Sequence, residues 1–349
     1  MVKKAENIIV GISVGDLNGI GSEVILKTFE DIRMLELCTP VIFANVKILS
    51  FLKKEFNLAA AIHGIDKLDQ LVVGKINVLN VWREGVNLEF GKNDDVVGGY
   101  AVKSFIAATN ALKDGFVDVL VTAPINKYNI QSDDFKFPGH TDYLNKELTG
   151  DALMLMVHDD LRVGLLTDHV PVNEVAKNLT EKLIFSKIQT VVKTLKQDFE
   201  IEKPKIAVLG LNPHSGDNGV IGDEEEKIMK PALKKLFEAG NLVFGPFSAD
   251  GFFGSSQYEK YDAVIATYHD QGLIPFKTLS FGTGVNYTAG LDKIRTSPDH
   301  GTAYEIAGKG IANHESFKEA VYLAIDIYNK RNDYQELTKN PLKTKDKQL

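Results

Sequence analysis

The sequence predicts an α/β protein whose strands form a largely parallel sheet. Apolar runs of strand length alternate with longer amphipathic segments from one end of the chain to the other. The 349 residues are many for a single simple core, which favours two lobes or domains. Polar residues follow directly after several of the apolar runs, as is typical of ligand sites at the carboxyl ends of parallel strands.

Short apolar runs bounded by glycine, proline or polar residues predict the strands. In chain order they cover residues 8–13, 40–44, 76–81, 117–122, 152–157, 162–167, 205–211, 242–245, 263–267 and 284–289.

Longer segments with apolar residues at helical spacing predict the helices. They cover residues 22–33, 47–56, 96–113, 180–197, 224–239 and 316–330. In the third of these, Val97, Ala101, Phe105, Ala108 and Leu112 repeat on one side, so this helix is expected to pack one face on the sheet.

A polar segment with a Pro-Gly pair near residues 125–140 predicts a crossing between lobes. The first lobe is expected to comprise residues 1–137 and 292–335, because the strong final helix can return to it. The second lobe is expected to comprise residues 138–291. Residues 336–349 are polar and lysine-rich, which predicts a flexible tail.

Composition excludes several classes of protein. The formal net charge of -7 argues against nonspecific nucleic-acid binding. No apolar run reaches the roughly 18 residues needed to span a bilayer, and the first apolar stretch is too short for a secretory signal. The one cysteine, Cys38, excludes an internal disulfide and is interpreted as a packing residue. These features predict a cytoplasmic protein.

Three predicted strands are each followed by a histidine within a few residues: His169, His214 and His269. Imidazoles suit Zn²⁺ and similar divalent ions, and three protein ligands leave positions open for a substrate. The sequence therefore suggests a three-histidine metal site. The alternative is that these side chains only cap loops, since their spacing matches no local metal motif.

The stretch ATYHDQGLIPFK, residues 266–277, places His269 and Asp270 at a strand tip, turns at Gly272 and reaches Lys277. Lys277 and Arg295 flank turn-rich sequence, which suggests a pocket for a phosphate or carboxylate. Solvated surface cations are the alternative. His140 lies on a turn that opens a helix, where a ligand could be held.

The first glycine-rich loop, GDLNGIGSE at residues 15–23, follows a strand and precedes a helix. This order is that of an anion-binding turn, although the residues match neither the Rossmann nor the P-loop motif. A tight turn with Ser22 as the helix N-cap is the other interpretation.

The order of several motifs resembles that of the 4-hydroxythreonine-4-phosphate dehydrogenases of pyridoxal phosphate biosynthesis, over nearly the whole chain. The matching motifs are GDLNGIGSE, PGHT, TDHVPV, GLNPHSGDNGVIGDEE, YHDQGLIPFK and the glycine-rich residues 281–310. The chain departs from the usual family pattern at Leu17, Asn18 and Ser22, and in Ser-Ala-Asp-Gly-Phe at residues 248–252.

The resemblance implies a two-lobed α/β/α fold, similar to isopropylmalate and isocitrate dehydrogenases, with the active site in the cleft between lobes. It implies a homodimer in which the partner subunit supplies a metal ligand. One divalent ion, Zn²⁺, Mg²⁺ or Co²⁺, would be held by His169, His214 and His269. The implied substrate contacts are His140, Thr141, Lys277, Asn286 and Arg295.

Residues 300–313 resemble the adenosine loop of the isopropylmalate dehydrogenases. The resemblance implies cofactor contacts by His300, Gly301, Thr302, Glu305 and Asn313. A carboxylate at Glu305 would accept hydrogen bonds from the adenosine ribose and repel a 2′-phosphate. NAD is therefore expected in preference to NADP.

The implied reaction is metal-dependent oxidation of 4-phosphohydroxy-L-threonine by NAD or NADP to 2-amino-3-oxo-4-phosphohydroxybutyrate, which decarboxylates to 3-amino-2-oxopropyl phosphate. Asp250, Asp270 and Lys277 are the candidate catalytic residues. The alternative substrates are related four-carbon phosphates such as 4-phosphothreonate or 4-phosphoerythronate. The rival classes are a non-catalytic phosphometabolite-binding protein and a phosphate acyltransferase-like enzyme.

Overall fold

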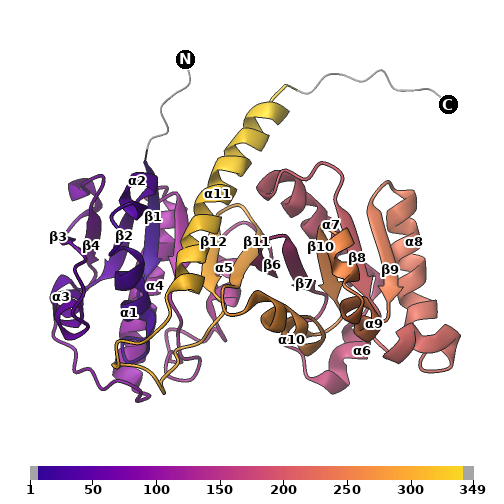
Figure 1. Cartoon of the computed structure of the whole chain (residues 1–349), viewed down its shortest axis with the longest axis horizontal. Helices are drawn as coiled ribbons and strands as arrows, with labels where there is room; N and C mark the ends of the chain where they lie inside the picture. The colour runs from indigo at the N-terminus through magenta and orange to yellow at the C-terminus, as the bar shows by residue number, and fades with distance from the viewer. Residues whose placement is uncertain (1–6, 341–349) are drawn as a thin grey trace.

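All strands belong to one continuous sheet, which runs through the whole molecule (Figure 1). The computed structural model describes residues 7–340. Across the sheet the strand order is β3-β4-β2-β1-β5-β12-β11-β6-β7-β10-β8-β9. The bounds are β1 Ile8–Ser13, β2 Cys38–Ala44, β3 Ile62–Ile65, β4 Ile76–Asn80, β5 Val119–Thr122, β6 Gly150–His158, β7 Leu161–Leu165, β8 Lys205–Leu209, β9 Leu242–Phe247, β10 Ala263–Ala266, β11 Val285–Leu291 and β12 Arg295–Pro298.

The sheet is parallel at both ends and antiparallel in the middle. β1 pairs in parallel with β2 and β5, and β10 with β7 and β8. β11 is antiparallel to both β12 and β6, and β6 is antiparallel to β7. The predicted α/β class with a largely parallel sheet is confirmed, while the predicted division into lobes stays a prediction.

Helices cover both faces of the sheet. Their bounds are α1 Gly21–Thr28, α2 Met34–Leu37, α3 Val46–Glu55, α4 Asp95–Lys113, α5 His140–Glu147, α6 Val175–Asn178, α7 Glu181–Asp198, α8 Lys230–Glu238, α9 Ala249–Gly254, α10 His269–Ser280 and α11 Glu315–Thr338. Shorter helical turns are η1 Leu68–Gln70, η2 Val172–Glu174, η3 Pro213–Gly219, η4 Glu225–Met229 and η5 Gln257–Lys260. No helix of residues 7–340 is long and apolar enough to cross a bilayer.

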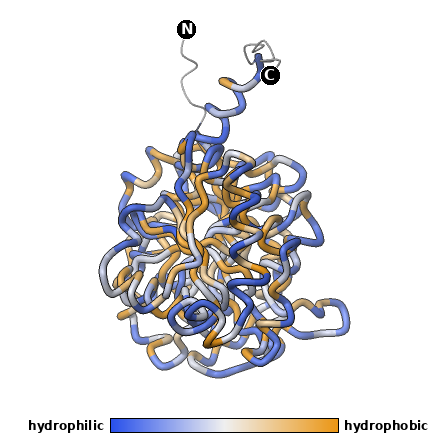
Figure 2. Tube along the Cα trace, turned by 90° about the vertical axis from the view of Figure 1, so that its right-hand side faces the viewer, coloured by the Kyte–Doolittle hydropathy of each residue, from blue (hydrophilic) through white to orange (hydrophobic). Residues whose placement is uncertain are grey.

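The two faces of the sheet are packed differently. On one face, α1, α3, α7, α8 and α11 share a single apolar core that extends across the sheet. On the other face, one cluster lies under α4 and α5, and a separate cluster lies under α9 and α10. Figure 2 shows the apolar segments gathered in the interior. The gap between the two clusters is where a cavity can form.

Local sequence explains the long helices. The Asp94 carboxylate accepts hydrogen bonds from the backbone N–H groups of Val96 and Val97, which caps α4. The Thr180 hydroxyl caps α7 through the N–H of Leu183. The five apolar residues predicted to face the sheet from α4 are all buried, so that orientation is confirmed.

A buried ion pair ties α11 to the layer below. Arg331 Nε lies 2.8 Å from Asp198 Oδ1, and its Nη2 lies 2.8 Å from the Tyr287 hydroxyl. The Tyr287 hydroxyl donates to Asp198 Oδ2 at 2.6 Å. The three residues come from α11, α7 and β11, so this polar group joins three elements of the layered fold.

Several predicted boundaries were wrong. β3 and β12 are not among the strands that the sequence predicts. The predicted turn at Gly272 lies inside α10. The tail was expected from residue 336, whereas α11 continues to Thr338; residues 341–349 lie outside the described part of the chain.

Candidate active site

A cavity of about 490 Å³ lies where the two core clusters separate. Its wall includes the ends of β5 and β12, the start of α5, part of β11 and one side of α10. The predicted site residues in this wall are His140, Thr141, His169, His269, Lys277, Asn286, Arg295, His300 and Gly301. Tertiary structure thus brings together residues that are far apart in the sequence.

Strand alternation directs two of these side chains into the cavity. Val285 and Tyr287 belong to the core on the α11 face, so Asn286 between them points to the opposite face. On β12, the Thr296 hydroxyl donates to the Ala320 carbonyl of α11. Its neighbour Arg295 therefore also points into the cavity.

Arg295 is a buried cation that contacts no carboxylate of residues 7–340. It is 3% exposed, and its hydrogen bonds go to uncharged groups. Nε and Nη2 donate to the Thr122 hydroxyl at 3.0 and 2.6 Å, and Nη1 donates to the Thr288 hydroxyl at 3.1 Å. Burial lowers the pKa of Arg295 to about 9, so the guanidinium remains charged at neutral pH. Such an uncompensated buried cation is suited to an anionic ligand.

His140 is held in one tautomer by Arg295. Its Nδ1 lies 3.0 Å from Arg295 Nη2, and a guanidinium can only donate, so Nδ1 accepts. Burial and then the charges of Arg295 and Lys127 lower the pKa of His140 well below its usual value. The neutral ring must carry its proton on Nε2, which is buried and has no hydrogen-bond partner among residues 7–340. This N–H is free to donate to a ligand oxygen.

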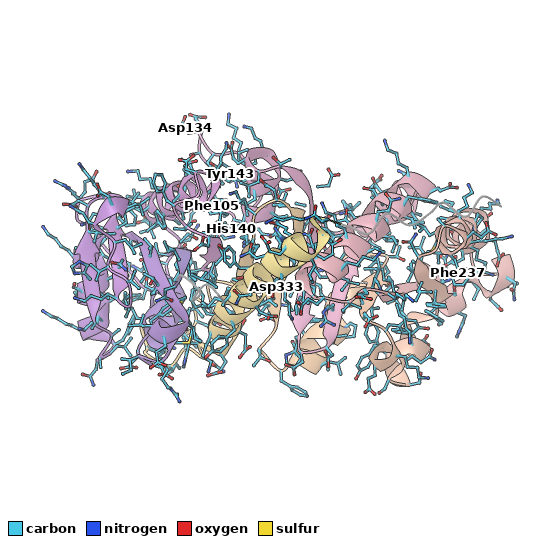
Figure 3. The ribbon with its side chains drawn as sticks, turned by 90° about the horizontal axis from the view of Figure 1, so that it is seen from above. Phe105, Asp134, His140, Tyr143, Phe237 and Asp333 are labelled. Atoms are coloured by element: carbon cyan, nitrogen blue, oxygen red, sulfur yellow. The ribbon has the colours of Figure 1, made fainter. Side chains whose placement is uncertain are left out.

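Aromatic packing fixes the position of the His140 ring. Phe105 of α4 meets it edge-on at 4.5 Å between centroids, and Tyr143 lies 5.1 Å from Phe105 (Figure 3). α5 begins at His140, as the sequence indicated. A second unpartnered buried atom in the wall is Asn286 Oδ1. Together with Arg295, His140 Nε2 and Asn286 Oδ1 form a polar site whose hydrogen-bonding groups are available to a ligand.

His269 is the first residue of α10, and Asp270 orients its imidazole. Asp270 Oδ1 lies 2.7 Å from His269 Nδ1, which leaves Nε2 available as a metal donor. The ring of His169, which follows β7, lies 5.9 Å from that of His269 between centroids. Two of the three predicted metal ligands therefore approach each other.

His214 follows β8 and does not line the cavity. It lies in the turn Pro213–Gly219, where six successive residues have positive φ, including His214 at 54°. The turn contacts α9, and the charge of His214 is among the influences that lower the pKa of Asp250, after the Ser248 hydroxyl. Within residues 7–340 of one chain, no group of three His, Cys, Asp or Glu side chains is arranged to hold a metal.

The other predicted residues divide by location. Lys277, in the last turn of α10, donates to the Asp299 carbonyl at 3.1 Å. Asp250, Asp270, Thr302, Glu305 and Asn313 do not contribute to the cavity wall. The sequence did not identify Thr122 and Thr288, which hold Arg295; the position of Thr122 at the end of a strand was the available signal.

The glycine-rich residues 15–23 are all buried, and none lines this cavity. The backbone of Ile20 precedes α1, and Ser22 makes no capping hydrogen bond. Of the two interpretations of this loop, the tight turn fits the structure, but the proposed Ser22 cap was wrong.

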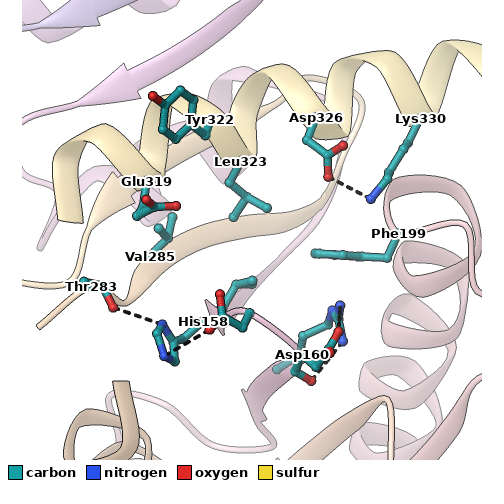
Figure 4. A pocket seen from close by; sticks show the side chains of 13 residues that line it. His158, Asp160, Phe199, Thr283, Val285, Glu319, Tyr322, Leu323, Asp326 and Lys330 are labelled. Atoms are coloured by element: carbon teal, nitrogen blue, oxygen red, sulfur yellow. Dashed lines mark hydrogen bonds and ion pairs between the residues drawn. The ribbon is translucent and has the colours of Figure 1, made fainter. Parts of the chain in front are cut away.

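A second cavity, of about 640 Å³, lies on the α11 side of the sheet (Figure 4). Its wall contains four carboxylates, those of Asp159, Asp160, Glu319 and Asp326. Arg162 is stacked over the Phe199 ring and lies 3.7 Å from Asp160. Although larger, this acidic cavity is less suited to an anion than the one around Arg295.

The fold and the cavity around Arg295 define a layered α/β protein with a buried guanidinium and several histidines in one cavity wall. The family described as "Pyridoxal phosphate biosynthetic protein PdxA" matches residues 36–324, and the chain belongs to this family. The resemblance inferred from the motifs is thereby confirmed.

Curated relatives and solved structures agree. A 4-hydroxythreonine-4-phosphate dehydrogenase of Bacteroides thetaiotaomicron is 46% identical over 96% of this chain and 92% of its own. A D-threonate 4-phosphate dehydrogenase of Cupriavidus necator is 36% identical over 93% of this chain and 98% of its own. The crystal structure of a 4-hydroxythreonine-4-phosphate dehydrogenase from Klebsiella pneumoniae has a TM-score of 0.78 and 32% identity, covering 94% of this chain and 99% of that one.

Proposed function

We propose that this protein oxidises 4-phosphohydroxy-L-threonine to 2-amino-3-oxo-4-phosphohydroxybutyrate in pyridoxal 5′-phosphate biosynthesis. The observation that carries the proposal is Arg295, a buried guanidinium that shares a cavity wall with His140 Nε2 and Asn286 Oδ1. In the described part of the chain, Arg295 has no carboxylate partner and the other two atoms have no hydrogen-bond partner. A phosphorylated amino acid offers anionic oxygens to Arg295 and His140, and donor groups to Asn286.

The residues of this chain would bind and orient that substrate. Arg295 would compensate negative charge, and the His140 Nε2–H would donate to a substrate oxygen. Lys277 is the one predicted catalytic residue that lines the cavity, so we assign proton handling at its Nζ to this residue. The secondary alcohol loses its hydroxyl proton to a base and its C–H hydride to the cofactor, forming a ketone. The resulting β-keto acid then loses CO₂.

The donor atoms present fit a divalent ion in part. His169 and His269 supply imidazoles, and the Asp270 contact leaves His269 Nε2 free. Imidazole donors favour Zn²⁺ or Co²⁺ over Mg²⁺. When bound, the ion would lower the pKa of the substrate alcohol. Because no three His, Cys, Asp or Glu side chains are arranged to hold a metal within residues 7–340 of one chain, we propose that a second copy of the chain completes the site in a homodimer.

We further propose NAD as the hydride acceptor, bound along residues 300–313. Glu305 is exposed in this segment, where its carboxylate would meet the ribose and disfavour NADP. His300, at the start of the segment, has a buried Nε2 without a partner. A cytoplasmic location accords with these ligands and remains part of the proposal.

A second candidate substrate is 4-phosphothreonate, which the 36% identity to the Cupriavidus necator protein supports. This molecule carries a hydroxyl where 4-phosphohydroxythreonine carries an amine. 4-Phosphoerythronate is the related diastereomer. All three would present the same phosphate to Arg295, so the choice depends on contacts near the carbon that bears the amine or hydroxyl.

The test is a spectrophotometric panel at 340 nm. Purified protein with Zn²⁺ or Co²⁺ is mixed with NAD or NADP and each of the three phosphates. We expect NAD reduction to be fastest with 4-phosphohydroxythreonine. Faster reduction with 4-phosphothreonate would assign the second candidate, and the absence of reduction with every pair would contradict a dehydrogenase of this class and favour a non-catalytic binding protein.

A further inference from the structure

The buried loop at residues 15–23 contacts the predicted cofactor segment instead of the cavity. Asp16 is 1% exposed, and its Oδ2 accepts a hydrogen bond from the Tyr304 hydroxyl at 2.6 Å. The same oxygen accepts from Asn129 Nδ2 at 2.8 Å, and Asp16 Oδ1 accepts from the Asn18 N–H at 2.8 Å. One hydrogen bond of this carboxylate therefore holds Tyr304, the residue that precedes Glu305, and the other two hold the carboxylate itself in place.

The backbone makes a second contact at the same end of the segment. The N–H of Ile20 donates to the Thr302 carbonyl at 3.1 Å. Gly19 lies so close to this peptide that a Cβ would stand 2.8 Å from the Thr302 oxygen. A glycine is required here because of this close approach, which accounts for one glycine of the GDLNGIGSE motif.

The far end of the segment is held by the following helix, α1. Glu23 Oε1 accepts from the Ala312 N–H at 2.8 Å and from Lys27 Nζ at 2.8 Å. Lys27 Nζ also donates to the carbonyls of Gly310 and Ala312, at 3.0 and 2.9 Å. Both ends of the segment are thus fastened to residues 16–27.

Residues 301–314 contain turns but no helix or strand, so their local hydrogen bonds are confined to a few turns around residues 303–309. An unfixed loop would lose conformational entropy when a ligand bound to it, and prior ordering removes that cost. Burial and the Asp16 contact raise the pKa of Tyr304, so its hydroxyl stays a donor across the physiological range.

We propose that Asp16, Tyr304, Glu23 and Lys27 form a clamp that presets residues 300–313 for the dinucleotide, with Asp16 and Tyr304 as positioning residues. The inference rests on the proposed assignment of this segment to the cofactor. It gives the N-terminal motif the role of supporting a loop nearly 300 positions away, since Tyr304 and Asp16 are 288 residues apart.

The test compares Tyr304→Phe with Tyr128→Phe, a matched loss of one hydroxyl. Tyr128 is 76% exposed and does not line the cavity. Hydrogen–deuterium exchange is measured on the ligand-free full chain, and NAD binding is measured by calorimetry. In Tyr304→Phe we expect faster exchange confined to residues 300–313, about tenfold weaker NAD binding, a raised KM for NAD and a kcat within about twofold of wild type. Tyr128→Phe should match wild type in all four measurements.

Gly19→Ala provides a second variant that acts through the Thr302 backbone and keeps every clamp side chain. This variant should also increase the rate of hydrogen–deuterium exchange in residues 300–313. If wild type binds NAD while both variants keep wild-type exchange and affinity, the clamp is overturned. If wild type binds neither NAD nor NADP, the cofactor assignment itself fails, and the role of the clamp in cofactor binding fails with it. Faster exchange spread over the whole chain would also overturn it, because that result indicates general destabilisation.

Discussion

Arg295 Nη2 lies 3.0 Å from His140 Nδ1, although the two residues are 155 positions apart. The contact determines the chemistry of both side chains. Arg295 gains a neutral acceptor that leaves its charge uncompensated, and His140 is kept neutral with its proton on Nε2. The anion site proposed for this protein depends on this pair.

Replacement of Arg295 by Met should remove the anion site and keep the fold. We expect KM for the phosphorylated substrate to rise by about 100-fold, since charge-assisted hydrogen bonds contribute roughly 1.5–3 kcal/mol. KM for NAD should change by less than about twofold. The free energy of unfolding, from urea titration, should change by at most about 1 kcal/mol, because an unpaired buried cation is replaced by an apolar group of similar length.

Arg331→Met is the matched control, since Arg331 is a buried arginine that does have a carboxylate partner. It should lower the free energy of unfolding by about 3–5 kcal/mol, because Asp198 would remain buried and unpaired. KM for the substrate should be unchanged in the folded variant. The opposite assignment, with stability lost in Arg295→Met and KM changed in Arg331→Met, would contradict the roles given to the two arginines.

His140 should make stability depend on pH. Its folded-state pKa lies below the unfolded value of about 6.5, so the unfolded chain binds more protons as pH falls below 6.5. The stabilisation that comes from a neutral, buried His140 is therefore fully present above pH 6.5. Below this pH the free energy of unfolding decreases, by up to about 1.4 kcal/mol per pH unit. Urea titrations at several pH values should show a steeper acid loss in wild type than in His140→Gln. If the free energy of unfolding decreases equally with falling pH in both proteins, His140 does not cause this pH dependence.

Removal of one imidazole should weaken metal binding. His269→Ala is expected to lose bound Zn²⁺ or Co²⁺, measured by elemental analysis and calorimetry, and to lose turnover. Asp270→Asn keeps the imidazole but alters its orienting partner, so metal affinity should fall by about 10- to 100-fold. His63→Ala, on edge strand β3, serves as the control and should keep its metal. Wild-type metal content in His269→Ala would exclude this residue as a ligand.

Glu305→Gln should weaken the preference for NAD over NADP. Removal of the repulsion with the 2′-phosphate is expected to shift the ratio of kcat/KM values by about 1–3 kcal/mol. The measurement is steady-state kinetics with both cofactors at a fixed substrate concentration. Glu238→Gln, an exposed carboxylate on α8, is the control. If the ratio of the kcat/KM values for NAD and NADP does not change, Glu305 is not the residue that contacts the ribose.

Mixed dimers should reveal a shared site. His269 and Arg295 line the same cavity of one chain, so variants in these two residues should not complement each other. His214 does not line that cavity and is proposed to complete the partner's site, so inactive His214→Ala and inactive Arg295→Ala chains should regain activity when refolded together. A full activity that persists in diluted, monomeric protein would contradict a site shared between subunits.

The sequence predicted those helices and strands whose apolar periodicity and capping residues do not depend on tertiary contacts. β1 was predicted at its observed bounds, and α4 and α7 to within a residue, because their apolar periodicity and caps act within a few positions. α10 was not expected, since Gly272 and Pro275 disfavour a helix locally. Its formation depends on the packing of Leu273 and Phe276 against the sheet, which only the folded chain provides.

The sequence by itself determined the class of the fold, the family, and which residue types could bind a phosphate or a metal, because motifs and periodicity are properties of the linear chain. Tertiary structure decided which of those residues meet. It placed Arg295, His140 and Asn286 in one cavity, brought His169 to His269 and joined Asp16 to Tyr304. Contacts across such separations depend on strand order and on the face to which each side chain points, and neither is encoded in local spacing.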